Sequence, residues 1–141
     1  MRAGIRSQAA AALVEFALVW PIALLIVLAT VEAAVWSEEA FAARVASLAG
    51  ARAGTVAGGT VAVAAEVARR ALSSSLVGVE AASWCPGGPR PAPPVWVCAV
   101  DLGTEVEVDI GGTAPALVPL VAGGGVPLRA HVILRKETFA P

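Results

Sequence analysis

The sequence predicts an α+β fold with one long N-terminal helix, a second shorter helix and a small antiparallel sheet of about three or four strands. Three observations carry this prediction. Residues 9–31 are almost entirely apolar, and apolar side chains then recur at three- and four-residue spacing as far as about residue 76. From residue 95 onward, apolar and polar residues alternate as they do in half-buried strands. The first helix is therefore expected to cross a membrane and to continue beyond it as an amphipathic helix.

The composition limits the classes of function. Of the 141 residues, 57% are hydrophobic and 15% are charged, whereas an ordinary soluble domain has about 25% charged residues. The length allows one domain, or one small domain plus an anchor. The net charge is −1 and the ten basic residues are scattered, so no surface for nucleic acid is indicated. The charge balance gives no indication of an acidic or basic substrate, and no small-molecule substrate is expected.

The apolar run from Ala9 to Val31 predicts the membrane helix. It contains one ionisable side chain, Glu15. At about 1.5 Å per residue the run spans roughly 34 Å, which is enough to cross a hydrocarbon core of about 30 Å. The alternative is a buried core helix, which needs a larger surrounding protein than this chain provides.

The charges on either side of the run predict its orientation. Arg2 and Arg6 precede it, and the acidic pair Glu38 and Glu39 follows it. Because basic residues are retained on the cytoplasmic side, the N-terminus is expected inside and the C-terminal portion outside. A cleaved secretory signal is the competing interpretation, but its apolar region is usually only about 7–15 residues long.

The residues around Glu15 carry a family resemblance. The segment from Ser7 to Pro21 reads Ser-Gln-Ala-Ala-Ala-Ala-Leu-Val-Glu-Phe-Ala-Leu-Val-Trp-Pro. It resembles the N-terminal region of the TadE-like pseudopilins, minor pilin-like proteins of the tight-adherence (Flp-type) pilus and secretion machinery. Leu48-Ala-Gly-Ala-Arg52 and the segment from Leu128 to Glu137 are similar to later segments of that family. The resemblance implies that the α+β fold is pilin-like.

The same resemblance implies processing by a prepilin peptidase. The family's glutamate is the fifth residue of the mature chain, which here places the cut between Ala10 and Ala11. The family has Gly before the cut, where this chain has Ala10. The chain would then consist of a basic cytoplasmic leader at residues 1–10, a transmembrane helix at 11–36 and an extracytoplasmic α+β domain at 37–141. It would be a single-pass protein of the cytoplasmic membrane.

Glu15 and Pro21 have expected roles within the helix. A mature chain that begins at Ala11 carries an ammonium group in the membrane, and a carboxylate one helical turn away offsets that charge within one chain or between neighbours. The alternative is that Glu15 lies at the cytoplasmic interface and reaches water. Pro21 has no N–H to donate and is expected to kink the helix.

Two helical segments are predicted beyond the membrane. Phe41, Val45 and Leu48 are expected to face the core from the first helix, which ends near Gly54 or Gly58. Its charged residues are expected on other faces: Glu38, Glu39, Arg44 and Arg52. Thr60 is expected to cap a second helix that continues to about Leu76. The buried stripe of that helix comprises Val61, Ala65, Ala68, Leu72 and Leu76.

The strands are predicted at residues 95–101, 104–110 and about 126–136. Asp101–Thr104 is expected to join the first two as a hairpin, and the glycine-rich stretches at 111–115 and 123–127 are expected to be loops. The inward-facing residues comprise Val106, Val108, Ile110, Leu128, Ala130, Val132 and Leu134. Glu105, Glu107 and Asp109 face outward, as do Arg129, His131 and Arg135, so opposite charges are expected to pair across the sheet.

Cys85 and Cys98 stand at the two ends of a proline-rich loop. Outside the cytoplasm, this arrangement predicts a disulfide, which would stabilise the fold by roughly 3 kcal/mol in the chain-entropy model for a loop of about 14 residues. Trp84 and Trp96 flank the cysteines and are expected to pack against the bond.

No metal or cofactor is predicted. The cysteines lack the further ligands that a metal site needs, and His131 is the only histidine. The three outward carboxylates could form a cation site, but they are interpreted as a solvated strand face.

Two functions follow from these expectations. The first is a structural protein, a minor pseudopilin that takes part in initiation or assembly of a tight-adherence pilus or secretion pseudopilus. Its partners would be the membrane, other pilin-like subunits, the assembly platform and the prepilin peptidase. The second is a permanently membrane-anchored extracytoplasmic binding or accessory module that does not polymerise. No catalytic constellation can be assembled, so the chain is not expected to be an enzyme.

Overall fold

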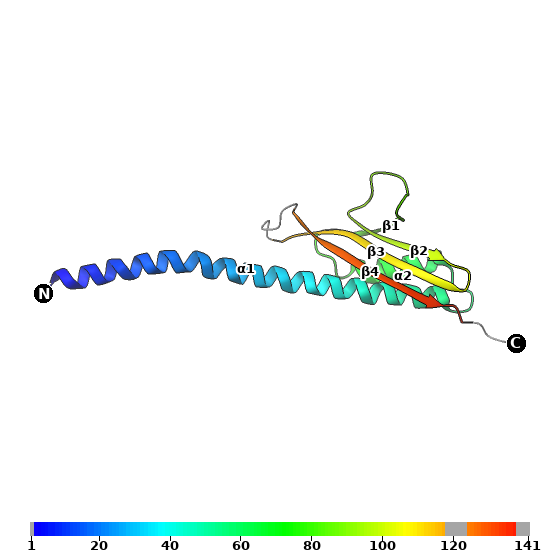
Figure 1. The fold of residues 1–141 in the computed structure, drawn as a ribbon, viewed down its shortest axis with the longest axis horizontal. Coiled ribbons are helices and arrows are strands. Elements are labelled where there is room, and N and C mark those ends of the chain that lie inside the picture. The colour runs from blue at the N-terminus through cyan, green and yellow to red at the C-terminus, as the bar shows by residue number, and fades with distance from the viewer. Residues whose placement is uncertain (1, 118–123, 138–141) are drawn as a thin grey trace. The chain divides into compact units, whose positions relative to one another are not determined.

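The computed structural model describes residues 2–117 and 124–137, and for residues 2–12 it describes the backbone alone. Two helices precede four strands in the described chain (Figure 1). Contacts between residues group the chain into two compact units, Met1–Ala34 and Val35–Pro141. The α+β, pilin-like layout expected from the sequence is confirmed, with a long apolar N-terminal helix, a second shorter helix and a four-stranded sheet.

Helix α1 spans Arg2–Thr55 and remains helical through Pro21. In the first unit its large apolar side chains are exposed from Leu13 to Val31, apart from the half-buried Leu28. The helix is long and apolar enough to cross a membrane, and none of its most apolar window is buried by the protein. This finding rests on length and composition, which an N-terminal signal sequence can also satisfy. The kink expected at Pro21 stays a prediction.

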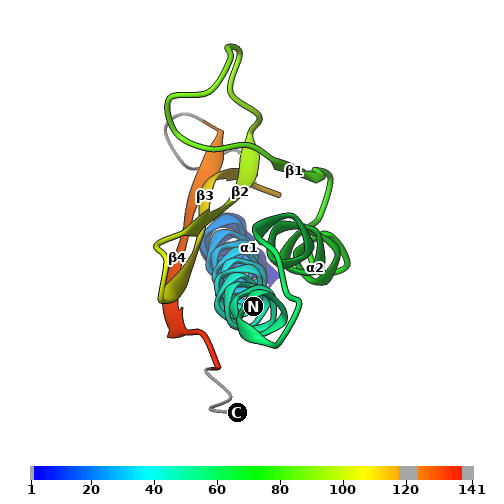
Figure 2. The same cartoon turned by 90° about the vertical axis from the view of Figure 1, so that its right-hand side faces the viewer.

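The second unit packs two helices on one face of the sheet. The end of α1 lies beside α2, which spans Val61–Ser73, and both cover the same side of the strands (Figure 2). The strands are β1 (Ala81–Ser83), β2 (Val95–Asp101), β3 (Glu105–Pro115) and β4 (Gly125–Arg135), in the order β1-β2-β3-β4.

The sheet differs in one pairing from the antiparallel sheet expected. β2, β3 and β4 pair antiparallel, but β1 runs parallel to β2. Parallel neighbours need a long connection, and residues 84–94, which include the proline-rich loop, provide one. The sheet is therefore mixed.

Small residues of α1 make its contact with α2. A Cβ added to Gly50 would lie 2.6 Å from the Ala64 carbonyl oxygen and 2.7 Å from Ala68 Cβ, so the two helices approach too closely there for any side chain. Gly54 fits similarly against Ala64 and Val106. The buried face of α1 in this unit comprises Glu39, Ala43, Ala46, Ser47, Gly50, Ala51, Gly54 and Thr55.

This packing corrects the buried face predicted for α1. Phe41 is 67% exposed and Val45 is 48% exposed, while Leu48 is half-buried. Glu39, expected on a solvated face, is only 2% exposed. The prediction ranked the faces by side-chain size, whereas the short distance between the helices selects the face with the smallest side chains.

Helix α2 begins as predicted. The Thr60 side chain accepts a hydrogen bond from the Val63 N–H, with Oγ1 3.2 Å from N. Ala65, Ala68 and Leu72 are buried as expected, together with Ala64. The helix ends at Ser73, so Leu76 packs against the core from beyond it and not from its last turn.

The strands place their apolar side chains as predicted. Val106, Val108, Ile110, Leu128 and Ala130 are buried, and Val132 and Leu134 pack against them. The glycine-rich stretches expected to be loops are partly strand, because β3 continues to Pro115 and β4 starts at Gly125. Gly123 lies outside the described residues.

Gly112 explains how β3 continues. Its φ is +129°, a conformation that favours glycine. A Cβ at this position would overlap the Pro94 carbonyl oxygen and lie 2.7 Å from Val95 Cα. The glycines therefore permit close pairing with β2 instead of ending the strand.

Candidate functional site

Helix α1 carries the residues singled out in the first unit. Glu15 is exposed on its surface, and Phe16 stacks on Trp20 with ring centroids 5.7 Å apart. Ala10 and Ala11 are helical, but their side chains lie outside the described part. Among the side chains described from residue 13 onward, none forms a hydrogen bond or ion pair with Glu15. The ammonium group proposed as its partner would lie among residues 2–12.

The outer face of the sheet carries the other candidate residues. In the strand register, Asp109 on β3 lies opposite His131 on β4, and Glu105 lies opposite Arg135. The register therefore places opposite charges across from each other at these two pairs. The other two outward charges, Glu107 and Arg129, lie opposite Ile133 and Gly111. At the end of the β2–β3 hairpin, Lys136 Nζ donates to both carboxylate oxygens of Asp101 at 2.7 Å.

His131 lies among two carboxylates. Its Nδ1 is 2.7 Å from Asp109 Oδ1 and 3.5 Å from Glu107 Oε1. The hydrogen bond to Asp109 raises the pKa of His131 above its usual value of 6.5, and the negative charges of Asp109 and Glu107 act in the same direction. The side chain of His131 is 53% exposed, so solvent screens these interactions.

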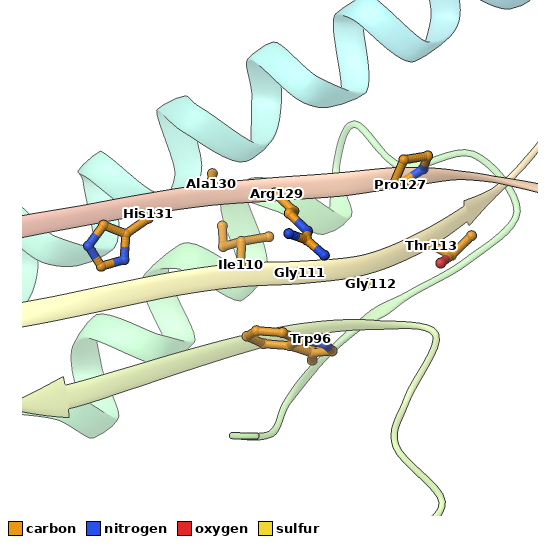
Figure 3. Close-up of a pocket in the computed structure, with 9 residues that line it drawn as sticks. All are labelled: Trp96, Ile110, Gly111, Gly112, Thr113, Pro127, Arg129, Ala130 and His131. Atoms are coloured by element: carbon orange, nitrogen blue, oxygen red, sulfur yellow. The ribbon is translucent and has the colours of Figure 1, made fainter. Parts of the chain in front are cut away.

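A hollow lies beside His131 on the same face. It has a volume of about 630 Å³, and Figure 3 shows Trp96 on β2 and Arg129 on β4 on either side of the glycines of β3. Trp96, Gly111 and Arg129 form one row across the sheet. The Trp96 indole covers Gly111 so closely that a Cβ there would lie 2.9 Å from its Cε2. Trp96 thus supplies the apolar wall of the hollow.

Cys85 and Cys98 form the predicted disulfide, with their Cα atoms 4.7 Å apart. Trp84 and Trp96 pack edge to face, with ring centroids 5.9 Å apart. The Trp84 indole N–H also donates to the Pro89 carbonyl oxygen at 2.9 Å. The disulfide and the two indoles therefore hold the proline-rich loop to the outer face of β2.

Two contacting residues were missed by sequence reasoning. The buried Glu39 carboxylate accepts a hydrogen bond from the Val77 N–H, with Oε1 3.2 Å from N, which ties the segment after α2 to α1. The Trp36 indole N–H donates to the Pro127 carbonyl oxygen at 3.3 Å. Glu39 shares a helix face with Ala43 and Gly50, so a search for small-residue spacing would have found it.

No protein-family model matches this sequence, no curated protein matches it, and no solved structure matches its fold.

Proposed function

We propose that this chain is a minor pseudopilin that takes part in the initiation or assembly of a tight-adherence type pilus or secretion pseudopilus. The observation that carries the proposal is that α1 presents different surfaces in the two units. In the first unit the helix exposes an apolar surface that contains Glu15, and in the second unit its small-residue face packs into an α+β core. In this proposal the first unit spans the cytoplasmic membrane, and the second unit lies outside the cytoplasm.

The apolar surface that α1 exposes in the second unit also supports assembly. Phe41 and Val45 line a shallow hollow of about 280 Å³ together with Ala71 of α2. A domain that is only tethered has no need of large exposed side chains here. A neighbouring pilin-like subunit would cover them.

Processing by a prepilin peptidase is the first test. N-terminal sequencing of the chain from membranes of cells with and without the peptidase should give a start at Ala11 only when the peptidase is present. An Ala10→Gly variant should be processed at least as completely, because Gly is the family's residue there, and an Ala10→Leu variant should be processed less. An intact Met1 in both cell types would refute processing and favour the anchored module.

The role of Glu15 is tested separately. Glu15→Gln keeps the size of the side chain and removes its charge, so recovery of other pilin-like subunits after cross-linking and purification should fall. The matched control is Glu80→Gln, an exposed glutamate of the second unit that does not line the hollow beside Phe41, and it should leave recovery unchanged. Equal recovery of partners with both variants would show that the Glu15 charge has no part in assembly.

The anchored binding module remains the second candidate. The hollow between Trp96 and Arg129 favours it, because an aromatic wall beside a guanidinium group can hold a ligand. Loss of partner recovery on changing Arg129, with no dependence on Glu15 or on the peptidase, would select this module over the pseudopilin.

A further inference from the structure

Three side chains with metal-ligand atoms converge on the outer face of the sheet, on different residues from those that carry the proposed function. Glu107 and Asp109 come from β3, and His131 comes from β4. Their ligand atoms all lie within 4.8 Å of one another. Two outward positions of one strand and one of its neighbour thus bring three possible ligand atoms close together.

The distances are close to those of a coordination shell. In a tetrahedral site with bonds of about 2.1 Å, ligand atoms lie roughly 3.4 Å apart. His131 Nδ1 and Glu107 Oε1 are already 3.5 Å apart, and Nδ1 and Asp109 Oδ1 are 2.7 Å apart. The second pair would have to open by about 0.7 Å, which rotation of exposed side chains allows. The third pair, between the Glu107 and Asp109 oxygens, lies within 4.8 Å.

The chemistry of the three ligands indicates the class of ion. One imidazole with two carboxylates suits zinc and its neighbours, whereas calcium and magnesium prefer oxygen ligands alone. Two carboxylates with a neutral imidazole carry a charge of −2, which a divalent ion balances. We propose that Glu107, Asp109 and His131 bind one divalent transition-metal ion, with Zn²⁺ as the best fit, and that solvent completes its coordination.

The competing arrangement of the same atoms is a His–Asp ion pair without metal. A proton on His131 Nδ1 occupies the position of the ion, so metal and proton compete for this nitrogen. Zn²⁺ affinity should therefore fall on acidification, because the metal binds only the deprotonated nitrogen. The other charged groups on this face are Glu105 and Arg135, which lie opposite each other, and Arg129 beside the hollow.

The test uses the full chain in detergent micelles, without a histidine tag, titrated with ZnCl₂ in an isothermal calorimeter. Imidazole resonances recorded during the titration report on one residue, because the chain has a single histidine. We expect one Zn²⁺ per chain, a shift of the His131 resonances, and much weaker binding of Ca²⁺. His131→Gln and Asp109→Asn should each weaken Zn²⁺ binding at least ten-fold.

Glu105→Gln is the matched control, because it removes the next outward carboxylate of β3 and should change the affinity less than two-fold. All these side chains are outside the core, so far-UV circular dichroism should show each variant folded. Unchanged Zn²⁺ affinity in His131→Gln, no heat and no His131 shift at millimolar Zn²⁺, or equal affinity for Ca²⁺ would each overturn the proposal. None of these outcomes bears on the pseudopilin proposal, whose tests are processing and Glu15.

Discussion

The substitution Gly50→Ala tests the close packing of α1 on α2. The added methyl group would lie 2.6 Å from the Ala64 carbonyl oxygen and 2.7 Å from Ala68 Cβ. One of these atoms belongs to the backbone and the other is attached directly to it, so neither can rotate away. To reach an ordinary separation the helices must move apart by several tenths of an ångström.

The expected change in folding free energy for Gly50→Ala is the sum of two opposing effects. Overpacking of this kind costs about 1–3 kcal/mol, and two rigid contacts place the cost toward the upper end. Replacing glycine by alanine inside a helix returns about 1 kcal/mol through helix propensity. The net loss of folding free energy is then about 2 kcal/mol. For a domain of about 100 residues this lowers the unfolding temperature by roughly 8 °C.

The assay is thermal unfolding of the full chain in detergent micelles, followed by tryptophan fluorescence. Trp84 and Trp96 report on the second unit, because their indoles pack together there. Gly54→Ala is the graded comparison, since its Cβ would lie farther from its neighbours, 2.9 Å from Ala64 Cβ and 3.1 Å from Val106 Cγ1, with no backbone atom at 2.6 Å. It should cost less than Gly50→Ala.

A double-mutant cycle makes the reasoning specific. Ala68→Gly removes one of the two atoms that the new methyl group meets, so it should cost less in the Gly50→Ala background than in the unaltered chain. A Gly50→Ala variant as stable as the unaltered chain, or more stable, would mean that α1 and α2 do not approach at this point. Additive effects of Gly50→Ala and Ala68→Gly would refute their contact.

Three further predictions concern the second unit. Leu72→Ala truncates a side chain with 0% exposure and should lower the free energy of unfolding, measured by chemical denaturation, by about 2–5 kcal/mol. Val45→Ala, on the exposed surface of α1, should change it by less than about 0.5 kcal/mol. Reducing the disulfide, whose cysteines are separated by 13 positions, should cost roughly 3 kcal/mol, and an unchanged midpoint under reductant would contradict this. The His131–Asp109 pair raises the pKa of His131 in the folded state, so its contribution is fully present below pH 6.5 and is lost as the pH rises through the folded-state pKa. The difference in unfolding temperature between the unaltered chain and Asp109→Asn, measured without metal, should therefore shrink from pH 5.5 to 8.5.

Much of the sheet was predictable because one face of it is solvated. Period-two alternation then shows directly which side chains are buried, and β2 was placed at residues 95–101 as observed. The cap at Thr60 was similarly local, because it depends on one side chain and the start of its own helix. The same alternation placed Asp109 and His131 outward, but only the register set them opposite each other.

The errors arose where distant residues decide the structure. The strand through Gly111 and Gly112 depends on the Trp96 indole and the Pro94 carbonyl group, which occupy the space of the missing side chains. Taken alone, two adjacent glycines indicate a turn. The parallel strand β1 has only three residues, too few for any periodic pattern.

The buried face of α1 was the most instructive error, because its cause bears on function. Glycine and alanine face the domain's own core at Ala43, Ala46 and Gly50, so Phe41 and Val45 are left on the surface. A helix that only had to support its own domain could bury the large side chains and gain more from the hydrophobic effect. Keeping them exposed sacrifices that gain, and a contact with another subunit would recover it. Cross-linking from a cysteine placed at Phe41 should therefore capture a pilin-like partner. The control is a cysteine at Arg52, on the exposed surface of the same helix. Equal capture from both positions would refute the argument that Phe41 and Val45 contact another subunit.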